Sequence, residues 1–226
     1  MDLAPRLIDT VTPADPSAVV LVLHGGADRQ DSPGVSPTQL SVLRMIPVAK
    51  AVARAGRGRL AVHRLLNTRR GWDTHHTPVD DVAWALEQVR ERYGDRPVGL
   101  VGHSLGGRAA LLAGGLDCVR SVVALNPWVY PTDGVPMPGR SVLVVHGMRD
   151  RIAPAGRAET VARRIAAHTH VGFIRIPDGK HAMLRHGRSF DAYAAQFSAA
   201  SLLGTDGLEV SGPVGSVLAG ESWVTA

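Results

Sequence analysis

The residues best suited to covalent chemistry lie at positions 101–107, where the sequence reads VGHSLGG. Here a G-x-S-x-G segment follows a short apolar run and precedes a stretch with helical character. In a strand–turn–helix of this kind, the glycines permit a sharp turn and a close approach of strand and helix, and the serine hydroxyl is lifted above the sheet. This context predicts that Ser104 is a nucleophile for acyl transfer. The alternative is a Gly/Ser turn that only joins a strand to a helix.

Two further polar residues follow other apolar runs and complete a set for nucleophilic catalysis. Asp150 comes shortly after the run 141–145, and His181 follows the run 171–176. A serine hydroxyl needs a base within hydrogen-bond reach, and the base needs a carboxylate that fixes its tautomer. We therefore predict that Ser104, Asp150 and His181 form a catalytic triad. The alternatives are a helix N-cap for Asp150 and an ordinary loop histidine for His181.

The segment His24-Gly25-Gly26 is a candidate for holding the negative charge that acyl transfer builds on a carbonyl oxygen. Preorganised backbone N–H donors stabilise such an oxyanion. We predict that one donor is the amide of Leu105, directly after the nucleophile, and that the other is the amide of Gly26, which has no side chain to block the oxygen. Ala27 is the alternative second donor. His24 is expected to pack or hydrogen-bond beneath the loop rather than to react.

These residues must be positioned by short apolar segments that alternate with longer amphipathic ones. Runs of Val, Ile and Leu bounded by turn residues are typical of strands covered on both faces. Strands that alternate with helices predict a doubly wound, mostly parallel sheet, in which ligands bind at the carboxyl ends of the strands. We expect strands at Ala18–Leu23, Leu60–Leu65, Val98–Val101, Ser121–Leu125, Ser141–Val145 and Val171–Ile176.

Helical spacing of apolar residues fills the intervals between these strands. Pro78–Tyr93 begins with a proline and two aspartates, which suit the first turn of a helix and the positive end of its dipole. In the stretch 38–55 we expect Pro47 to introduce a kink. The expected helices are Thr38–Ala55, Pro78–Tyr93, Ser104–Gly114 and Pro154–His168.

The segments HGG, GHSLGG, HGMRD-x-x-x-P and GKHAML together resemble the α/β-hydrolase superfamily, especially its small lidless esterase and dienelactone-hydrolase-like members. The resemblance extends over residues 19–197. It implies Ser104 as nucleophile, Asp150 as the acid of the triad and His181 as base, in the chain order of that fold. Where the superfamily commonly begins with an antiparallel hairpin, only residues 3–12 precede the first parallel strand. We therefore expect an α/β-hydrolase fold with helices on both faces and about six or seven strands.

The substrate pocket is expected to be built from loops, because residues 126–140 are too few for the helical lid of larger relatives. This connection contains Trp128 and Tyr130, which either line an acyl or alcohol pocket or plug the core.

A second loop at the same edge of the sheet supplies Arg69, Arg70 and Trp72. A guanidinium there would hold a substrate carboxylate through two parallel hydrogen bonds. A solvated loop is the alternative, and the residue types favour it.

Composition narrows the remaining function classes. The 226-residue chain carries a formal charge of +5, but its 25 Lys and Arg residues are nearly balanced by 20 Asp and Glu residues. Only 4% of residues are aromatic, so we expect no nucleic-acid partner. One cysteine rules out an intrachain disulfide, and neither a secretory signal nor a membrane-spanning run is recognisable, so we expect a cytoplasmic protein without membrane contact. His75 and His76, with Asp73, are weak evidence for a metal, and we expect neither a metal nor an organic cofactor.

The sequence predicts one hydrolase domain over residues 1–202 and a C-terminal extension, residues 203–226, whose order it leaves open. The expected activity is hydrolysis of an ester, thioester or related acyl bond of a small-molecule substrate through an acyl-enzyme. Because fold does not fix chemistry, one alternative is a relative that cleaves carbon–carbon bonds, transfers acyl groups or cyclises its substrate in secondary metabolism. Another is a binding protein that only retains the fold. The natural substrate and the oligomeric state stay open.

Overall fold

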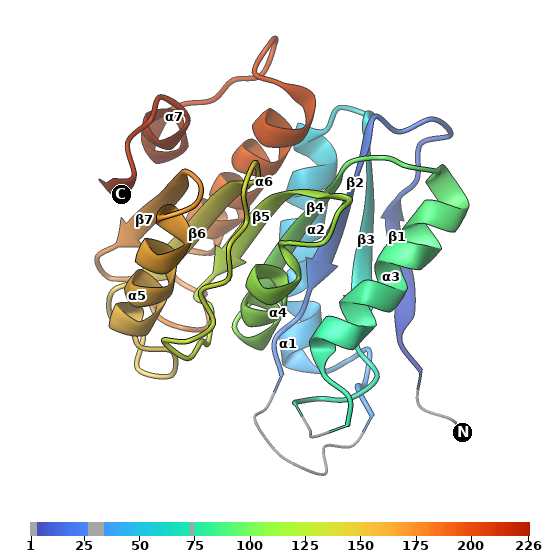
Figure 1. Cartoon of the computed structure of the whole chain (residues 1–226), viewed down its shortest axis with the longest axis horizontal. Helices are drawn as coiled ribbons and strands as arrows, with labels where there is room; N and C mark the ends of the chain where they lie inside the picture. The colour runs from blue at the N-terminus through green and yellow to red at the C-terminus, as the bar shows by residue number, and fades with distance from the viewer. Residues whose placement is uncertain (1–3, 27–33, 73–74) are drawn as a thin grey trace.

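The computed structural model describes residues 4–26, 34–72 and 75–226. Its eight described strands form one sheet in the order β1-β3-β2-β4-β5-β6-β7-β8 (Figure 1). Strand β1 runs antiparallel to β3, and every other neighbouring pair is parallel. The strands are β1 (Arg6–Val11), β2 (Ala18–Leu23), β3 (Leu60–Leu66), β4 (Val98–His103), β5 (Val119–Leu125), β6 (Ser141–Gly147), β7 (Val171–Ile176) and β8 (Trp223–Thr225).

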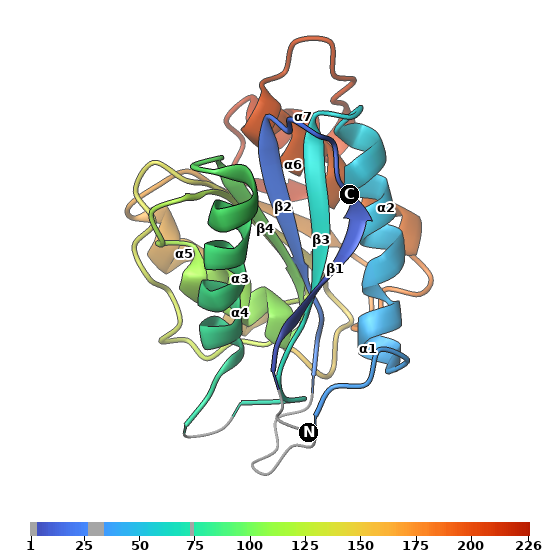
Figure 2. The same ribbon diagram turned by 90° about the vertical axis from the view of Figure 1, so that its right-hand side faces the viewer.

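Helices cover both faces of this sheet, which confirms the predicted α/β-hydrolase architecture (Figure 2). One apolar core lies between the sheet and α3, α4 and α5, and a second core lies between the opposite face and α2, α6 and α7. Every residue of β2 and β4 is buried, as expected for strands covered on both sides. The helices are α1 (Leu40–Leu43), α2 (Met45–Ala55), α3 (Pro78–Tyr93), α4 (Leu105–Ala113), α5 (Ala155–Ala166), α6 (Gly187–Leu203) and α7 (Gly212–Leu218).

The sheet is larger than the six or seven strands expected from the sequence. Besides β1, which pairs antiparallel with β3, residues 223–225 form β8 and pair with β7. Trp223 packs on Phe173 with 5.1 Å between ring centroids, and Arg163 lies 4.5 Å from the centroid of the Trp223 ring. The C-terminal segment therefore contributes α7 and an edge strand, which are fixed by contacts far apart in the sequence.

The single kinked helix expected at 38–55 is instead two helices, α1 and α2, that meet at Arg44. Pro47 is the third residue of α2 and so lies in its first turn. A proline is tolerated there because the first N–H groups of a helix have no intrahelical acceptor. The helix is interrupted one turn before Pro47, next to Leu43, whose carbonyl would accept from an N–H at position 47. The irregularity predicted for this proline is therefore a break between two helices.

Candidate active site

The nucleophile candidate sits on a sharp turn between β4 and α4. Ser104 has a φ of 56° and a ψ of −120°, a region that residues with a side chain rarely occupy and that stores local strain. The turn is possible because the two flanking residues, Gly102 and Gly106, have no side chain and so allow a close approach of the backbone. A Cβ on Gly102 would lie 2.1 Å from the Gly106 carbonyl oxygen, and a Cβ on Gly106 would lie 2.5 Å from the carbonyl oxygens of His24 and Leu23.

The carboxyl ends of β4, β6 and β7 bring Ser104, Asp150 and His181 together. Nε2 of His181 lies 2.9 Å from Oγ of Ser104, and Nδ1 of His181 lies 2.7 Å from Oδ2 of Asp150. Because a carboxylate can only accept, Nδ1 carries the proton and Nε2 is left to accept from the serine hydroxyl. This is the arrangement that activates a serine, although the catalytic roles themselves stay a prediction.

Asp150 is held as an ionised carboxylate in a buried position. Its side chain is 0% exposed, and its Oδ1 accepts hydrogen bonds of 2.8 Å from the backbone N–H groups of Ile152 and Ala153. Burial raises the pKa of Asp150, but the hydrogen bonds from His181, Ala153 and Ile152 outweigh it, so the pKa lies below its ordinary value. The N-cap-like contacts and the histidine contact therefore occur at once, on different oxygens.

The loop that carries His181 is clamped from below by two buried side chains. Asn126, 0% exposed, donates from Nδ2 to the carbonyl oxygens of Lys180 and His181 at 3.1 Å each, and its Oδ1 accepts from the Gly147 N–H at 2.8 Å. His103 donates from Nε2 to the same His181 carbonyl at 2.8 Å. Both contacts fix the backbone of the histidine and thereby the direction of its ring.

The surroundings of His103 keep its imidazole ring neutral. Burial, together with the nearby His181, lowers the pKa of His103 to about 3. An unfolded histidine titrates near 6.5, so below that pH the unfolded chain binds a proton that the native state does not. The contribution of His103 to the free energy of unfolding therefore falls as the pH drops from 6.5 towards 3.

We expect the His103→Gln variant to lose part of this pH dependence, because an amide still donates to the His181 carbonyl but does not titrate. The slope of unfolding free energy against pH should be smaller by up to about 1.4 kcal/mol per pH unit below pH 6.5. Denaturant unfolding at pH 6.5, 5.5 and 4.5 measures it, with His168→Gln at an exposed site as control. Equal slopes in the wild type and both variants would contradict the buried, neutral state of His103.

The segment after β2 runs directly against the nucleophile. A Cβ on Gly25 would lie 3.2 Å from Cβ of Ser104, and a Cβ on Gly26 would lie 1.7 Å from the Arg70 carbonyl oxygen, so no side chain fits at Gly26. Leu105 is the first residue of α4, where backbone N–H groups have no acceptor within the helix. Gly26 and Leu105 stay the predicted oxyanion donors, whereas Ala27 lies outside the described residues.

His24 has the supporting place expected of it. Its Nδ1 donates to the Gly25 carbonyl at 2.6 Å, and its Nε2 accepts from the Asn67 N–H at 3.1 Å, so the ring is neutral. Burial lowers the pKa of His24, which agrees with that state. His24 therefore ties the glycine loop to the end of β3.

Aromatic side chains predicted for the pocket gather around an arginine that the sequence had not suggested. Arg108 lies 4.1 Å from the ring centroid of Trp72 and 4.8 Å from that of Tyr130, and Trp128 packs edge-on against Tyr130 at 5.0 Å. Asp133 fixes the guanidinium with two hydrogen bonds of 2.7 and 3.2 Å. The backbone N–H of Trp128 bonds to the Ser104 carbonyl at 3.1 Å, so this cluster begins beside the nucleophile.

The two loop arginines take different positions. Residue Arg69 forms an isolated antiparallel bridge with Gly34, and Arg70 is exposed with its carbonyl against Gly26. Their binding of a substrate carboxylate stays a prediction.

Among residues 4–26, 34–72 and 75–226, no group of three His, Cys, Asp or Glu side chains is arranged to hold a metal, and Asp73 lies outside that part. None of the helices within these ranges is long and apolar enough to cross a membrane.

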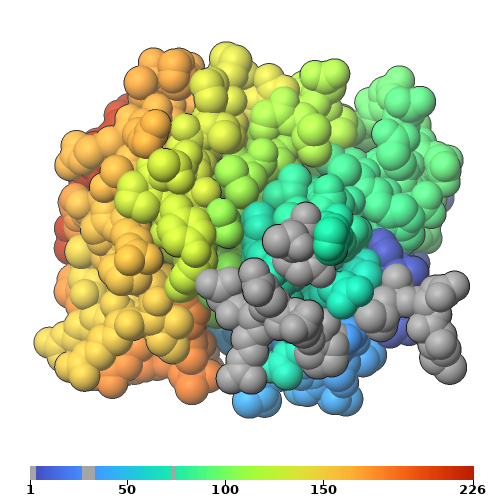
Figure 3. Space-filling view, turned by 60° about the horizontal axis from the view of Figure 1, so that its bottom comes forward, coloured from blue at the N-terminus to red at the C-terminus, as the bar shows by residue number. Residues whose placement is uncertain are grey.

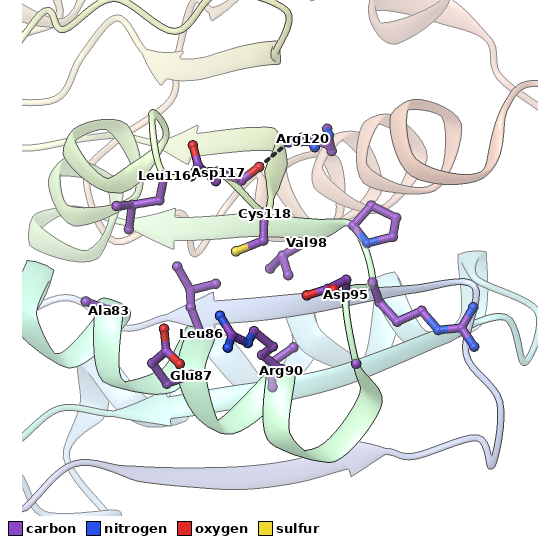
Figure 4. Close-up of a pocket in the computed structure, with 14 residues that line it drawn as sticks. Ala83, Leu86, Glu87, Arg90, Asp95, Val98, Leu116, Asp117, Cys118 and Arg120 are labelled. Atoms are coloured by element: carbon purple, nitrogen blue, oxygen red, sulfur yellow. Dashed lines mark hydrogen bonds between the residues drawn. The ribbon is translucent and has the colours of Figure 1, made fainter.

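A separate cavity of about 690 Å³ lies at the opposite edge of the sheet (Figure 4). Leu86 and Arg90 of α3 face it, together with Val98 at the start of β4 and Cys118 and Arg120 around the start of β5. Burial raises the pKa of the Cys118 thiol, so the thiol stays protonated at neutral pH. The amino ends of the strands lie here, far from the candidate triad.

The chain matches one protein family by sequence and resembles many solved structures in its fold. The family model described as alpha/beta hydrolase fold matches residues 18–139, more than half of the chain. A thermophilic esterase of Thermogutta terrifontis, solved with propionate, has a TM-score of 0.68 at 14% identity and covers 92% of both chains. Est1E of Butyrivibrio proteoclasticus has a TM-score of 0.64 at 13% identity, with 88% of this chain and 93% of that chain covered. An alpha-beta serine hydrolase homologue of Coxiella burnetii has a TM-score of 0.63 at 16% identity, with 84% and 89% covered. No curated protein matches the sequence.

Proposed function

Because the chain belongs to the alpha/beta hydrolase fold family, we propose that it is a serine hydrolase that cleaves an ester, thioester or related acyl bond through an acyl-enzyme. The observation that carries this proposal is the continuous hydrogen-bonded series from Ser104 Oγ through His181 to the buried Asp150. Several structural neighbours are esterases, which is consistent with a hydrolase. Because they are only 12–18% identical to this chain, they support the fold and not a particular activity.

In the first step, Oγ of Ser104 attacks the acyl carbon while Nε2 of His181 removes the hydroxyl proton. Asp150 keeps the proton on Nδ1 and stabilises the imidazolium that forms. The carbonyl electron pair moves onto the oxygen, and the N–H groups of Leu105 and Gly26 would donate hydrogen bonds to the resulting oxyanion. A single such donor typically stabilises the transition state by about 3–4 kcal/mol.

The tetrahedral intermediate then collapses, and the bond to the leaving oxygen or sulfur breaks. That atom takes the proton from Nε2 of His181, which leaves Ser104 acylated. Water attacks the acyl-enzyme with His181 again as base, and the carboxylic acid and free Ser104 are released. His103 and Asn126 act through His181 as positioning residues, because they hold its backbone and touch no reacting atom.

The direct test combines a fluorophosphonate probe with p-nitrophenyl acetate. A serine hydrolase should bind one probe per chain, as Oγ displaces fluoride from phosphorus, and should lose its esterase activity in step with labelling. A protein that is neither labelled nor able to turn over a chemically diverse set of acyl esters would not be a serine hydrolase.

We expect short acyl chains to be turned over better than long ones. Residues 126–140 form neither helix nor strand, and Tyr130 on this connection is 42% exposed, so the pocket at this side is shallow. A deep apolar channel would instead gain about 0.8 kcal/mol for each buried methylene. The value of kcat/KM should peak between two and four acyl carbons in a p-nitrophenyl series. A steady rise up to twelve carbons, by several-fold per two carbons, would reveal a long channel.

A further inference from the structure

A cationic cleft adjoins the candidate triad on the side away from β4. It has a volume of about 610 Å³ and lies between the loops that follow β6 and β7. Figure 3 looks towards this edge of the molecule, and the two loops, yellow and orange, lie together on it. His181 lines the cleft and also lies 2.9 Å from Ser104 Oγ, so the cleft is one side chain away from the candidate nucleophile.

The walls of the cleft are fixed by backbone contacts between the two loops. The N–H groups of Met148 and Arg149 donate to the carbonyls of Ile176 and Gly179 at 2.9 and 3.0 Å. Gly147 packs so closely on Gly179 that a Cβ on either would lie within 2.6 Å of the other's backbone. A cleft held in this way presents its side chains from a rigid frame.

Cationic side chains outnumber carboxylates in and around the cleft. Arg149, Arg151 and Lys180 line it, and all three are exposed. Asp178 pairs with Arg149 at 2.9 Å, but in the part of the chain that the structure describes no carboxylate forms an ion pair with Arg151 or Lys180. Asp150 also lines the cleft, and its ionised carboxylate offsets part of this charge, but it is buried and hydrogen-bonded to His181 rather than paired with Arg151 or Lys180.

The proton transfers of the proposed reaction indicate which half of an ester substrate would face this cleft. The leaving oxygen must take its proton from Nε2 of His181, so the alcohol half of the substrate lies against His181. Gly26, one of the predicted oxyanion donors, follows β2, which lies on the other side of β4 from β6 and β7. Met148 and Ile152, 40% and 63% exposed, add apolar surface beside the cations.

We infer that the cleft binds an anionic group, a carboxylate or a phosphate, on the alcohol half of the acyl substrate. This inference rests on the proposed serine hydrolase activity and names the substrate class that the activity would prefer. Arg151 and Lys180 supply the attraction, and the apolar side chains contact the carbon skeleton that carries the anion.

The test compares 4-acetoxybenzoate with 4-acetoxybenzamide, its neutral counterpart, in the wild type and in Arg151→Gln/Lys180→Gln. Comparing the same two esters across proteins cancels their difference in intrinsic reactivity. We expect the ratio of kcat/KM, anionic over neutral, to fall about five-fold in the double variant and to fall with added salt in the wild type. Arg90→Gln/Arg120→Gln removes the same charge at the distant cavity of Figure 4 and should keep the wild-type ratio.

Two further ester pairs locate and identify the anion. 4-Acetoxyphenyl phosphate against 4-acetoxyphenol tests phosphate in place of carboxylate, and the larger dependence on Arg151 and Lys180 identifies the preferred group. Mono-p-nitrophenyl glutarate against p-nitrophenyl valerate places the charge on the acyl half. A dependence on the two cations only in this acyl pair would overturn the inference, as would an unchanged ratio in all three pairs.

Binding of 4-hydroxybenzoate, measured by calorimetry, separates this inference from the proposed function. Binding that weakens about five-fold in Arg151→Gln/Lys180→Gln supports the cleft even if no ester is hydrolysed. Equal affinity in the wild type and the variant, together with turnover of neutral esters, would leave the hydrolase in place and overturn the anionic cleft.

Discussion

Replacing Ser104 with alanine is expected to lower ester turnover by about 10⁴- to 10⁶-fold, because the nucleophile acts as a unit with its base and acid. The fold should persist, since alanine keeps the Cβ that packs against Gly25 and the strained φ of 56° is the same for both residues. The hydroxyl makes one described side-chain contact, with His181, and its loss leaves the base beside an empty position. The measurement is kcat/KM on p-nitrophenyl acetate, with the melting temperature as a check on folding.

A fluorophosphonate should label the wild type at Ser104 and leave the Ser104→Ala variant unlabelled. Ser17→Ala, which removes an exposed serine just before β2, should keep both activity and labelling. Labelling at another serine, or near wild-type turnover by the Ser104→Ala variant, would sink the assignment of the nucleophile.

Much of the fold could be predicted because strand apolarity is a local property. Runs such as residues 18–23 and 171–176 are buried on both faces, and their composition alone indicates a parallel sheet. Strand β8 could not be predicted in this way. It is three residues long, follows a Gly- and Ser-rich stretch, and owes its place to Trp223 packing on Phe173, some fifty residues earlier in the chain.

The candidate site shows the same division between local and distant information. Ser104, Asp150 and His181 could be predicted to lie together because each follows an apolar run, and parallel strands end at one edge of the sheet. Asn126 also follows such a run directly, but no role was predicted for it. Its contacts with the carbonyls of Lys180 and His181 depend on how a loop 54 and 55 residues away is routed, which no local pattern reveals.

Arg108 was missed for a related reason. It is a helical residue four positions after Ser104, where a charged side chain is ordinarily solvated. Arg108 stands out only through its contacts with Trp72, Tyr130 and Asp133, which belong to two separate loops. The aromatic residues themselves were recognised from their type and their position at the carboxyl edge.

The second large effect is expected for Asp150→Asn, and the contacts of the carboxylate decide its direction. Oδ1 accepts two backbone N–H groups, from Ile152 and Ala153, so the amide oxygen of asparagine must take that place. The reverse orientation would leave the buried N–H of Ala153 without an acceptor, at a cost of about 1–3 kcal/mol, and would also remove the acceptor of the part-buried Ile152 N–H. The new NH₂ group therefore faces His181.

An NH₂ group in that place donates to Nδ1 of His181 and drives the ring proton to Nε2. Nε2 then donates to the Ser104 hydroxyl instead of accepting from it, so His181 no longer acts as base in the resting enzyme. We expect kcat on p-nitrophenyl acetate to fall by about 10⁴-fold, while KM stays within about three-fold because the substrate does not contact Asp150. Asp117→Asn, an exposed position at the distant cavity, is the matched control and should retain activity. If Asp150→Asn kept kcat within ten-fold of the wild type, Asp150 would not be the group that fixes the tautomer, and the pair of short contacts at His181 would have to serve the fold alone.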